Sequence, residues 1–138
     1  MTRFYHGSSI KLKAGTILSG RGEDYEKKWG NNIEYKILED NRPDNFLSHK
    51  ESVFMTDNIE DIDNAGGATD FLFTVKPLGP VEKHDMAWQS EILLAIQSGA
   101  NLKEIKGMAN KYWEGVATEN PVWEYLTRKA KIIKVEEY

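Results

Sequence analysis

The chain has 138 residues, 40% of them hydrophobic and four of them tryptophan, so it can bury a substantial core. Its formal net charge is −4, which argues against the many basic contacts of general nucleic-acid binding. The chain has no cysteine, which excludes disulfides and thiolate metal sites.

The opening MTRFYHGSSIKLKAG lacks the apolar run of a signal peptide, and no segment has the length of a membrane span. We therefore expect a cytoplasmic protein with no membrane partner. No repeat or linker divides the chain, so we expect a single domain over residues 1–138, acting as a monomer.

The first expected elements are a strand over Arg3–His6 and a second short strand that begins near Ile17. Between Asp24 and Leu38, apolar residues recur every four positions, which predicts an amphipathic helix. The stretch Gly30-Asn31-Asn32 weakens this helix and can break it in two. Pro43 closes the region.

The compact apolar run Ser52–Thr56 predicts a buried strand. A short helix is expected over Ile59–Asn64, capped by Asp57 or Asn58 and ended by the glycine pair at 66–67.

The strongest strand pattern is Asp70–Val75, which ends at the Pro-Leu-Gly-Pro turn that follows. Two amphipathic helices come next, the second capped by Asn101. Their apolar faces are predicted to comprise Trp88, Ile92, Ala95 and Ile96 in the first, and Leu102, Ile105, Ala109 and Trp113 in the second.

The last two patterns, Val122–Leu126 and Lys131–Val135, predict a closing hairpin around Arg128-Lys129. The strands do not alternate strictly with helices. This order favours an α+β fold in which helices flank a sheet.

The three histidines, His6, His49 and His84, lie far apart in the sequence without paired spacing, so no metal site is expected. The GxxxxGK[ST] and GxGxxG phosphate-binding motifs are absent, as is the GxSxG nucleophile elbow. Nucleophilic hydrolases of the elbow type are thereby excluded.

Three short strands each carry one unusual residue, namely His6, Phe54 and Glu124. A carboxylate that points inward from an apolar strand must be paired, neutralised or used, because an unpaired buried charge is costly. Simpler roles remain open at this stage. His6 also fits a structural hydrogen bond, Phe54 a plain core position, and Glu124 a solvent-facing position.

In this order the three strands resemble the ADP-ribosyltransferases, NAD-dependent enzymes whose split sheet presents one motif on each of three strands. Tyr5-His6-Gly7 is similar to the first motif and Val53-Phe54-Met55-Thr56 to the second. Glu124-Tyr125-Leu126-Thr127, with the strand after it, is similar to the third. The resemblance implies a split mixed or antiparallel β-sheet sandwich with flanking helices.

The rifamycin-modifying branch of this superfamily is the most similar, through its FYHG-type opening and the turn in VKPLGPVEKHD. That branch draws an essential acid from just after the turn, near Glu82 or Asp85. Glu124 and Asp85 therefore compete for the catalytic carboxylate, and Asp85 also fits a helix cap. Phe54 stands where the His-Tyr-Glu branch carries a tyrosine, and Val122 disfavours arginine-type transfer.

The resemblance implies a mono-ADP-ribosyltransferase that uses NAD as co-substrate, needs no metal and releases nicotinamide. Glu124 would lie near the ribose hydroxyls and Phe54 against the nicotinamide. His6, with the Gly7 and Ser8 backbone, would anchor the adenosine half, and Gly7 would permit a close approach of the ligand. Tyr5 and Thr56 complete the expected NAD-binding set.

The expected acceptor is a protein, with a small molecule or a nucleic-acid end as alternatives. Small transferases of this kind occur in bacteria and their viruses, so the cytoplasm would be that of a bacterium or of a host cell. Two other functions stay open. One is an NAD-dependent RNA 2′-phosphotransferase, which the sparse histidines and the acidic balance disfavour. The other is a degenerate binding module, which Phe54 keeps possible.

Overall fold

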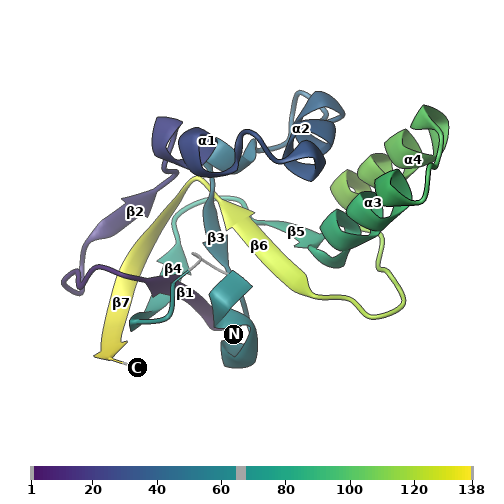
Figure 1. Ribbon diagram of the computed structural model, residues 1–138. Helices are drawn as coiled ribbons and strands as arrows, with labels where there is room; N and C mark the ends of the chain where they lie inside the picture. Colours follow the sequence, from purple (N-terminus) through teal and green to yellow (C-terminus); the bar gives the residue numbers. More distant parts are fainter. Residues whose placement is uncertain (1, 65–67, 138) are drawn as a thin grey trace.

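Two antiparallel sheets form the centre of the computed structural model, which describes residues 2–64 and 68–137 (Figure 1). We call them sheet A and sheet B. Sheet A has the order β1 (Phe4–Ser8), β4 (Phe71–Pro77), β7 (Lys129–Glu137), β2 (Ile17–Ser19). Sheet B has the order β3 (Val53–Met55), β6 (Trp123–Thr127), β5 (Glu82–Asp85). The α+β class expected from the sequence is confirmed.

The α-helices follow the sequence pattern closely. The first amphipathic pattern is broken where expected, into α1 (Glu23–Trp29) and α2 (Ile33–Asp40). The short 3-10 helices are η1 (His49–Glu51) and η2 (Ile59–Asn64), and the glycine pair expected to end η2 lies outside the described residues. α3 (Ala87–Gln97) and α4 (Leu102–Glu114) complete the set.

Asn101 caps α4 as expected, since its side-chain oxygen accepts the Glu104 amide at 2.9 Å. Leu102, placed by the pattern on the buried face of this helix, is instead 84% exposed. It is the first residue of α4, where the helix has not yet reached the core. Ile105, Ala109 and Trp113 are buried as predicted.

The predicted closing hairpin is wrong. β6 pairs with β3 and β5 in sheet B, whereas β7 pairs with β4 and β2 in sheet A. Only Arg128 separates the two strands, which is shorter than the two-residue loop that a tight hairpin needs. The chain therefore passes from one sheet directly into the other.

β5 is a strand that the sequence did not suggest. Its residues, Glu-Lys-His-Asp, include no β-branched side chain, and the segment was expected to be a turn leading into a helix. It is extended because it pairs with β6 along its whole length, from Glu82 opposite Leu126 to Asp85 opposite Trp123.

The two sheets meet at their edge strands. β1 is one of the two edge strands of sheet A, and β3 is one of the two edge strands of sheet B. A single antiparallel bridge joins them, in which the Tyr5 amide donates to the Thr56 carbonyl at 2.8 Å and the Thr56 amide to the Tyr5 carbonyl at 3.0 Å. This junction sets the relative position of residues on β1 and β3.

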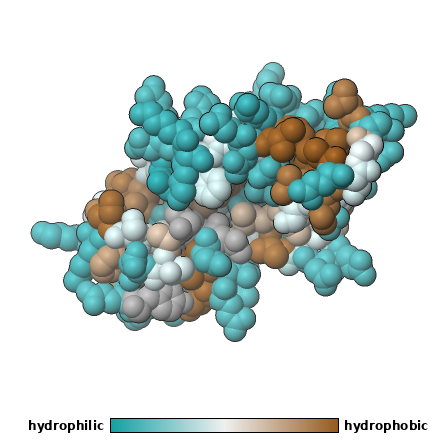
Figure 2. All heavy atoms as spheres, in the orientation of Figure 1, coloured by the Kyte–Doolittle hydropathy of each residue, from teal (hydrophilic) through white to brown (hydrophobic). Residues whose placement is uncertain are grey.

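The core has two main parts. One lies among α2, α3 and α4, and the other fills the space between the sheets. In Figure 1, α1 and α2 lie on one side of the sheets and the α3–α4 pair lies beside β5. Figure 2 shows hydrophobic residues gathered over α3, in which Leu94 is 56% exposed. Within residues 2–64 and 68–137, no helix has both the length and the apolar character needed to cross a membrane.

Candidate functional site

A cleft of about 490 Å³ opens where the two sheets separate. Its walls come from β1, β3, α1, η1 and the segment between β2 and α1, so both sheets contribute to it. The volume lies within the range of small-molecule sites. The residues most relevant to ligand chemistry are His6, Arg21, Tyr25, Trp29, His49 and Phe54.

His6 ties the two walls of the cleft together. Its Nδ1 lies 2.7 Å from the Phe54 carbonyl, and because a carbonyl only accepts, Nδ1 carries the hydrogen. Burial lowers the pKa of His6 and outweighs the hydrogen bond to Phe54, which acts to raise it; the nearby Arg21 charge adds a smaller lowering effect. A neutral ring protonated at Nδ1 leaves Nε2 as a hydrogen-bond acceptor.

Phe54 lies in an aromatic cluster rather than in a plain core position. The Tyr25 ring stacks on it at a centroid distance of 5.5 Å, and the His49 ring meets it edge-on at 5.4 Å. Tyr25 thus places a phenol beside Phe54, although Phe54 itself has none. Burial, followed by the charge of Glu124, raises the pKa of Tyr25 well above its usual value, so this phenol stays protonated.

Gly7 and Ser8 also line the cleft, as expected for β1. The close approach at Gly7, however, is made by the Ala68 backbone and not by a ligand, since a Cβ built at Gly7 would overlap the Ala68 carbonyl oxygen. Tyr5 and Thr56 form the junction between the sheets, and the Thr56 hydroxyl is occupied by the Asn58 backbone. These two residues shape the cleft through the backbone.

Glu124 lies in the protein interior with 1% of its surface exposed. It projects from β6 on the same face of sheet B as Phe54, two positions along from Leu126, which pairs with Phe54. Its Oε1 accepts the Tyr112 hydroxyl at 2.6 Å, whereas Oε2 has no partner among the described residues. Burial raises the pKa of Glu124 to about 8, with a smaller contribution from Asp85.

His49 connects this buried carboxyl group to the cleft. Its Nε2 lies 2.7 Å from the same Tyr112 hydroxyl, and its ring forms part of the cleft wall. Burial lowers the pKa of His49 to about 3, with smaller effects of His84 and Arg42. The ring is therefore neutral at physiological pH.

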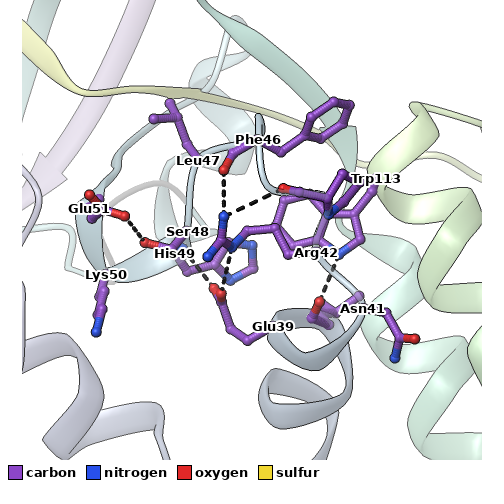
Figure 3. Close-up of polar contacts among 12 residues, drawn as sticks. Glu39, Asn41, Arg42, Phe46, Leu47, Ser48, His49, Lys50, Glu51 and Trp113 are labelled. Atoms are coloured by element: carbon purple, nitrogen blue, oxygen red, sulfur yellow. Dashed lines mark hydrogen bonds and ion pairs between the residues drawn. The ribbon is translucent and has the colours of Figure 1, made fainter.

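The end of α2 holds the backbone around His49 in place (Figure 3). Glu39 accepts the His49 amide at 2.8 Å, and its other oxygen pairs with Arg42 at 3.1 Å. Arg42 also donates to the Phe46 carbonyl at 2.7 Å. These contacts fix the segment that carries His49 against α2.

Asp85, the competing carboxylate, is fully buried and saturated by backbone amides. Its oxygens accept the amides of Ala87, Thr118 and Val122 at 2.9, 2.7 and 2.9 Å. Burial alone would raise the pKa of Asp85, but these hydrogen bonds outweigh it and hold the pKa below its usual value. Asp85 thus fastens the start of α3 to the segment before β6. Glu82, the other acidic residue expected near the turn, accepts the Leu47 amide at 2.8 Å.

Sequence reasoning missed several members of the site. His49 was considered only as a metal ligand, and Tyr25 only as part of a helix stripe. Tyr112 lies next to the predicted apolar face of α4 but was not identified as a site residue. No sequence pattern around Arg21 indicated that it would line a cleft. Among the described residues, no three side chains of the metal-ligating kinds come together as a possible metal site.

No protein-family model matches this sequence, and a search of curated proteins gives no significant match.

Proposed function

We propose that the protein binds NAD in the cleft and transfers its ADP-ribose to an acceptor, releasing nicotinamide. The observation that carries this proposal is the contact between His6 and Phe54 at the junction of the sheets. It brings together, at the cleft, the residues that resemble the first two motifs of the ADP-ribosyltransferases. The split between sheets A and B also supports an ADP-ribosyltransferase-like fold.

The lining of the cleft suits a dinucleotide. Aromatic faces of Tyr25, Trp29 and Phe54 can contact the flat nicotinamide and adenine rings. Arg21 and Lys28 supply positive charge for the pyrophosphate. The acceptor nitrogen of His6 matches a ribose hydroxyl, which can donate to it.

Glu124 is the better candidate for the essential carboxyl group. Breaking the bond between nicotinamide and ribose develops positive charge on the ribose carbon, which a nearby carboxylate stabilises. Glu124 lies on the sheet face that carries Phe54 and retains one oxygen without a partner. Asp85 has both oxygens committed to backbone amides, which favours its structural role.

The second candidate function is that of a module that binds NAD but does not transfer its ADP-ribose. The observation that favours it is the position of Glu124, whose Oε1 is bound to Tyr112 and whose side chain lies in the interior behind His49. A carboxyl group held in this way would not reach a ribose in the cleft without rearrangement. Binding with no release of nicotinamide would identify this function.

The test combines NAD binding by calorimetry with nicotinamide release, measured in the absence and presence of cell lysate. Wild type is compared with His6→Ala, Glu124→Gln and Asp85→Asn. We expect release to be lost in Glu124→Gln and retained, per folded molecule, in Asp85→Asn. Glu34→Gln and Asp63→Asn test the two carboxylates in the cleft lining. Wild-type protein that neither binds NAD nor releases nicotinamide would show the proposal to be wrong.

A further inference from the structure

Three buried side chains form a continuous hydrogen-bonded chain that begins at the cleft wall. His49 Nε2 lies 2.7 Å from the Tyr112 hydroxyl, which in turn lies 2.6 Å from Glu124 Oε1. All three side chains are at most 1% exposed. The residues come from η1, α4 and β6, so the fold rather than local sequence brings them together.

A hydroxyl between an imidazole and a carboxyl group can pass a proton in either direction. When Glu124 is ionised, the Tyr112 hydroxyl donates to Oε1 and accepts from the protonated Nε2 of His49. If His49 gains a proton at Nδ1, Nε2 can give its own to Tyr112, and Tyr112 can give its own to Glu124. Nδ1 of His49 makes no hydrogen bond within the described part of the chain, and its ring faces the cleft.

We propose that His49, Tyr112 and Glu124 form a proton relay whose outer end, His49, takes the proton of the acceptor nucleophile during the transfer. This inference rests on the proposed function for its reaction, but the relay itself is a property of the protein without ligand. His49 is then a catalytic residue, whereas Tyr112 acts through it.

The acceptor of ADP-ribose carries an O–H or N–H group. The electron pair of the acceptor atom forms the new bond to the ribose carbon, and the pair of the broken bond goes to the nicotinamide nitrogen. Nicotinamide thereby leaves uncharged. The acceptor proton moves to His49 Nδ1, the Nε2 proton to Tyr112, and the Tyr112 proton to Glu124.

Neighbouring elements hold the middle of the relay in position. The His84 ring stacks on Tyr112 at 4.7 Å, and His84 Nδ1 donates to the Tyr112 carbonyl at 2.8 Å. The Glu39 carboxylate fixes the His49 backbone. The titratable and charged groups that face the relay are His84 and Asp85 from β5, Tyr25 from α1, and Tyr35, Glu39 and Arg42 from α2 and the segment after it.

The first experiment tests the relay in the protein alone. The carboxyl carbon of Glu124 and both ring nitrogens of His49 are followed by NMR from pH 6 to pH 10. We expect the His49 nitrogens to respond as Glu124 ionises, and this response to vanish in Tyr112→Phe. The control is Tyr125→Phe, at the position next to Glu124 on β6. It also removes a tyrosine hydroxyl bound to a carboxylate, since the Tyr125 hydroxyl donates to Asp57 at 3.0 Å. If the chemical shifts of the His49 ring nitrogens do not change as Glu124 ionises, the relay is wrong.

The second experiment measures transfer against pH. The relay needs an ionised Glu124, so the wild-type rate should rise with pH and level off near the Glu124 pKa of about 8. Tyr112→Phe should lower the rate about 100-fold and flatten the profile, with the affinity for NAD unchanged. Tyr125→Phe should match wild type, and circular dichroism confirms that each variant is folded.

The two proposals fail in different ways. A wild type without NAD binding or turnover rejects the proposed function, and the NMR result then decides the relay by itself. An active wild type with unchanged rate and pH profile in Tyr112→Phe rejects the relay and leaves the transferase standing.

Discussion

The imidazole of His6, on edge strand β1 of sheet A, donates from Nδ1 to the carbonyl of Phe54, on edge strand β3 of sheet B, at 2.7 Å. One side chain therefore both holds the two sheets together and faces the cleft between them. These two tasks use different ring nitrogens, so they can be separated by substitution.

His6→Ala removes both nitrogens and should lower the free energy of unfolding by about 1–2 kcal/mol, because the Phe54 carbonyl loses its donor. His6→Asn keeps a donor near the position of Nδ1 but has nothing at Nε2. We expect the Asn variant to unfold in urea like wild type yet bind NAD as weakly as the Ala variant. Equal NAD affinity in wild type and Asn variant would show that Nε2 does not contact the ligand.

The ring of Tyr25, not its hydroxyl, should be what the cleft needs. Tyr25→Ala removes the face that stacks on Phe54 and should weaken NAD binding about 10-fold, as expected for an aromatic contact. Tyr25→Phe should bind NAD within about 2-fold of wild type. Calorimetric titration of both variants checks this, and a Phe variant as weak as the Ala variant would assign the role to the phenol.

Glu124 should make the protein less stable as pH rises. Its pKa is near 8 in the folded protein and near 4.5 when unfolded, so between these values the folded state holds a proton that the unfolded state has lost. Stability from this group is complete below pH 4.5 and declines by about 1.4 kcal/mol per pH unit until pH 8. The stability of Glu124→Gln relative to wild type should therefore grow by about 2 kcal/mol from pH 6.5 to pH 8.

The pH range above 6.5 isolates this effect. His49 has a lowered pKa of about 3, so it contributes stability that rises with pH up to the unfolded histidine value of 6.5 and is constant beyond it. Urea unfolding of both proteins at pH 6.5, 7.2 and 8 supplies the comparison. Parallel stability curves would mean that Glu124 is ionised throughout this range.

Asp85→Asn should be a folding defect and not a catalytic one. The two carboxylate oxygens of Asp85 accept hydrogen bonds from three backbone amides, whereas the side-chain amide of asparagine has only one acceptor oxygen. We therefore expect the free energy of unfolding to fall by about 2–3 kcal/mol at pH 7. Because the folded pKa is lowered, the contribution of Asp85 is present above pH 3.8 and is lost as the pH falls through the folded value. Thermal unfolding measures the loss, and a stable but inactive variant would restore Asp85 as the essential carboxylate.

Gly7→Ala should destabilise the protein by about 1–3 kcal/mol, because its Cβ would overlap the Ala68 carbonyl. Gly107→Ala is the matched control, since a Cβ there meets no atom within 4 Å and the residue lies inside α4. The control should gain about 0.5–1 kcal/mol from improved helix propensity. Chemical denaturation separates the two, and a neutral Gly7→Ala would mean that the segment at Ala68 yields readily.

The sequence predicted those features that depend on local chemistry. The helix break at Gly30-Asn31-Asn32 and the Asn101 cap follow from the conformational preferences of glycine and asparagine. The buried face of α4 followed from its spacing, except at Leu102, where the helix begins.

The remaining features depend on partners that are distant in the sequence. β5 is extended only because β6 lies beside it. The one-residue link between β6 and β7 resembles a hairpin turn in the sequence, because the sequence does not indicate that the two strands belong to different sheets. The relay was not predictable, because nothing near His49 in the sequence indicates that Tyr112 and Glu124 will surround it. The burial of Glu124 was raised as a possibility by its apolar strand, but its partner was not identified.

The passage of the chain from β6 in sheet B to β7 in sheet A has a kinetic consequence. Within the described residues no strand pairs with another across a short turn, and even β5 and β6 are separated by both α3 and α4. Every ladder must therefore close a long loop before it gains any hydrogen bonds, which places the protein among slow folders, on the order of milliseconds to seconds. The cleft, whose walls come from both sheets, can form only after strands that are distant in the sequence have paired.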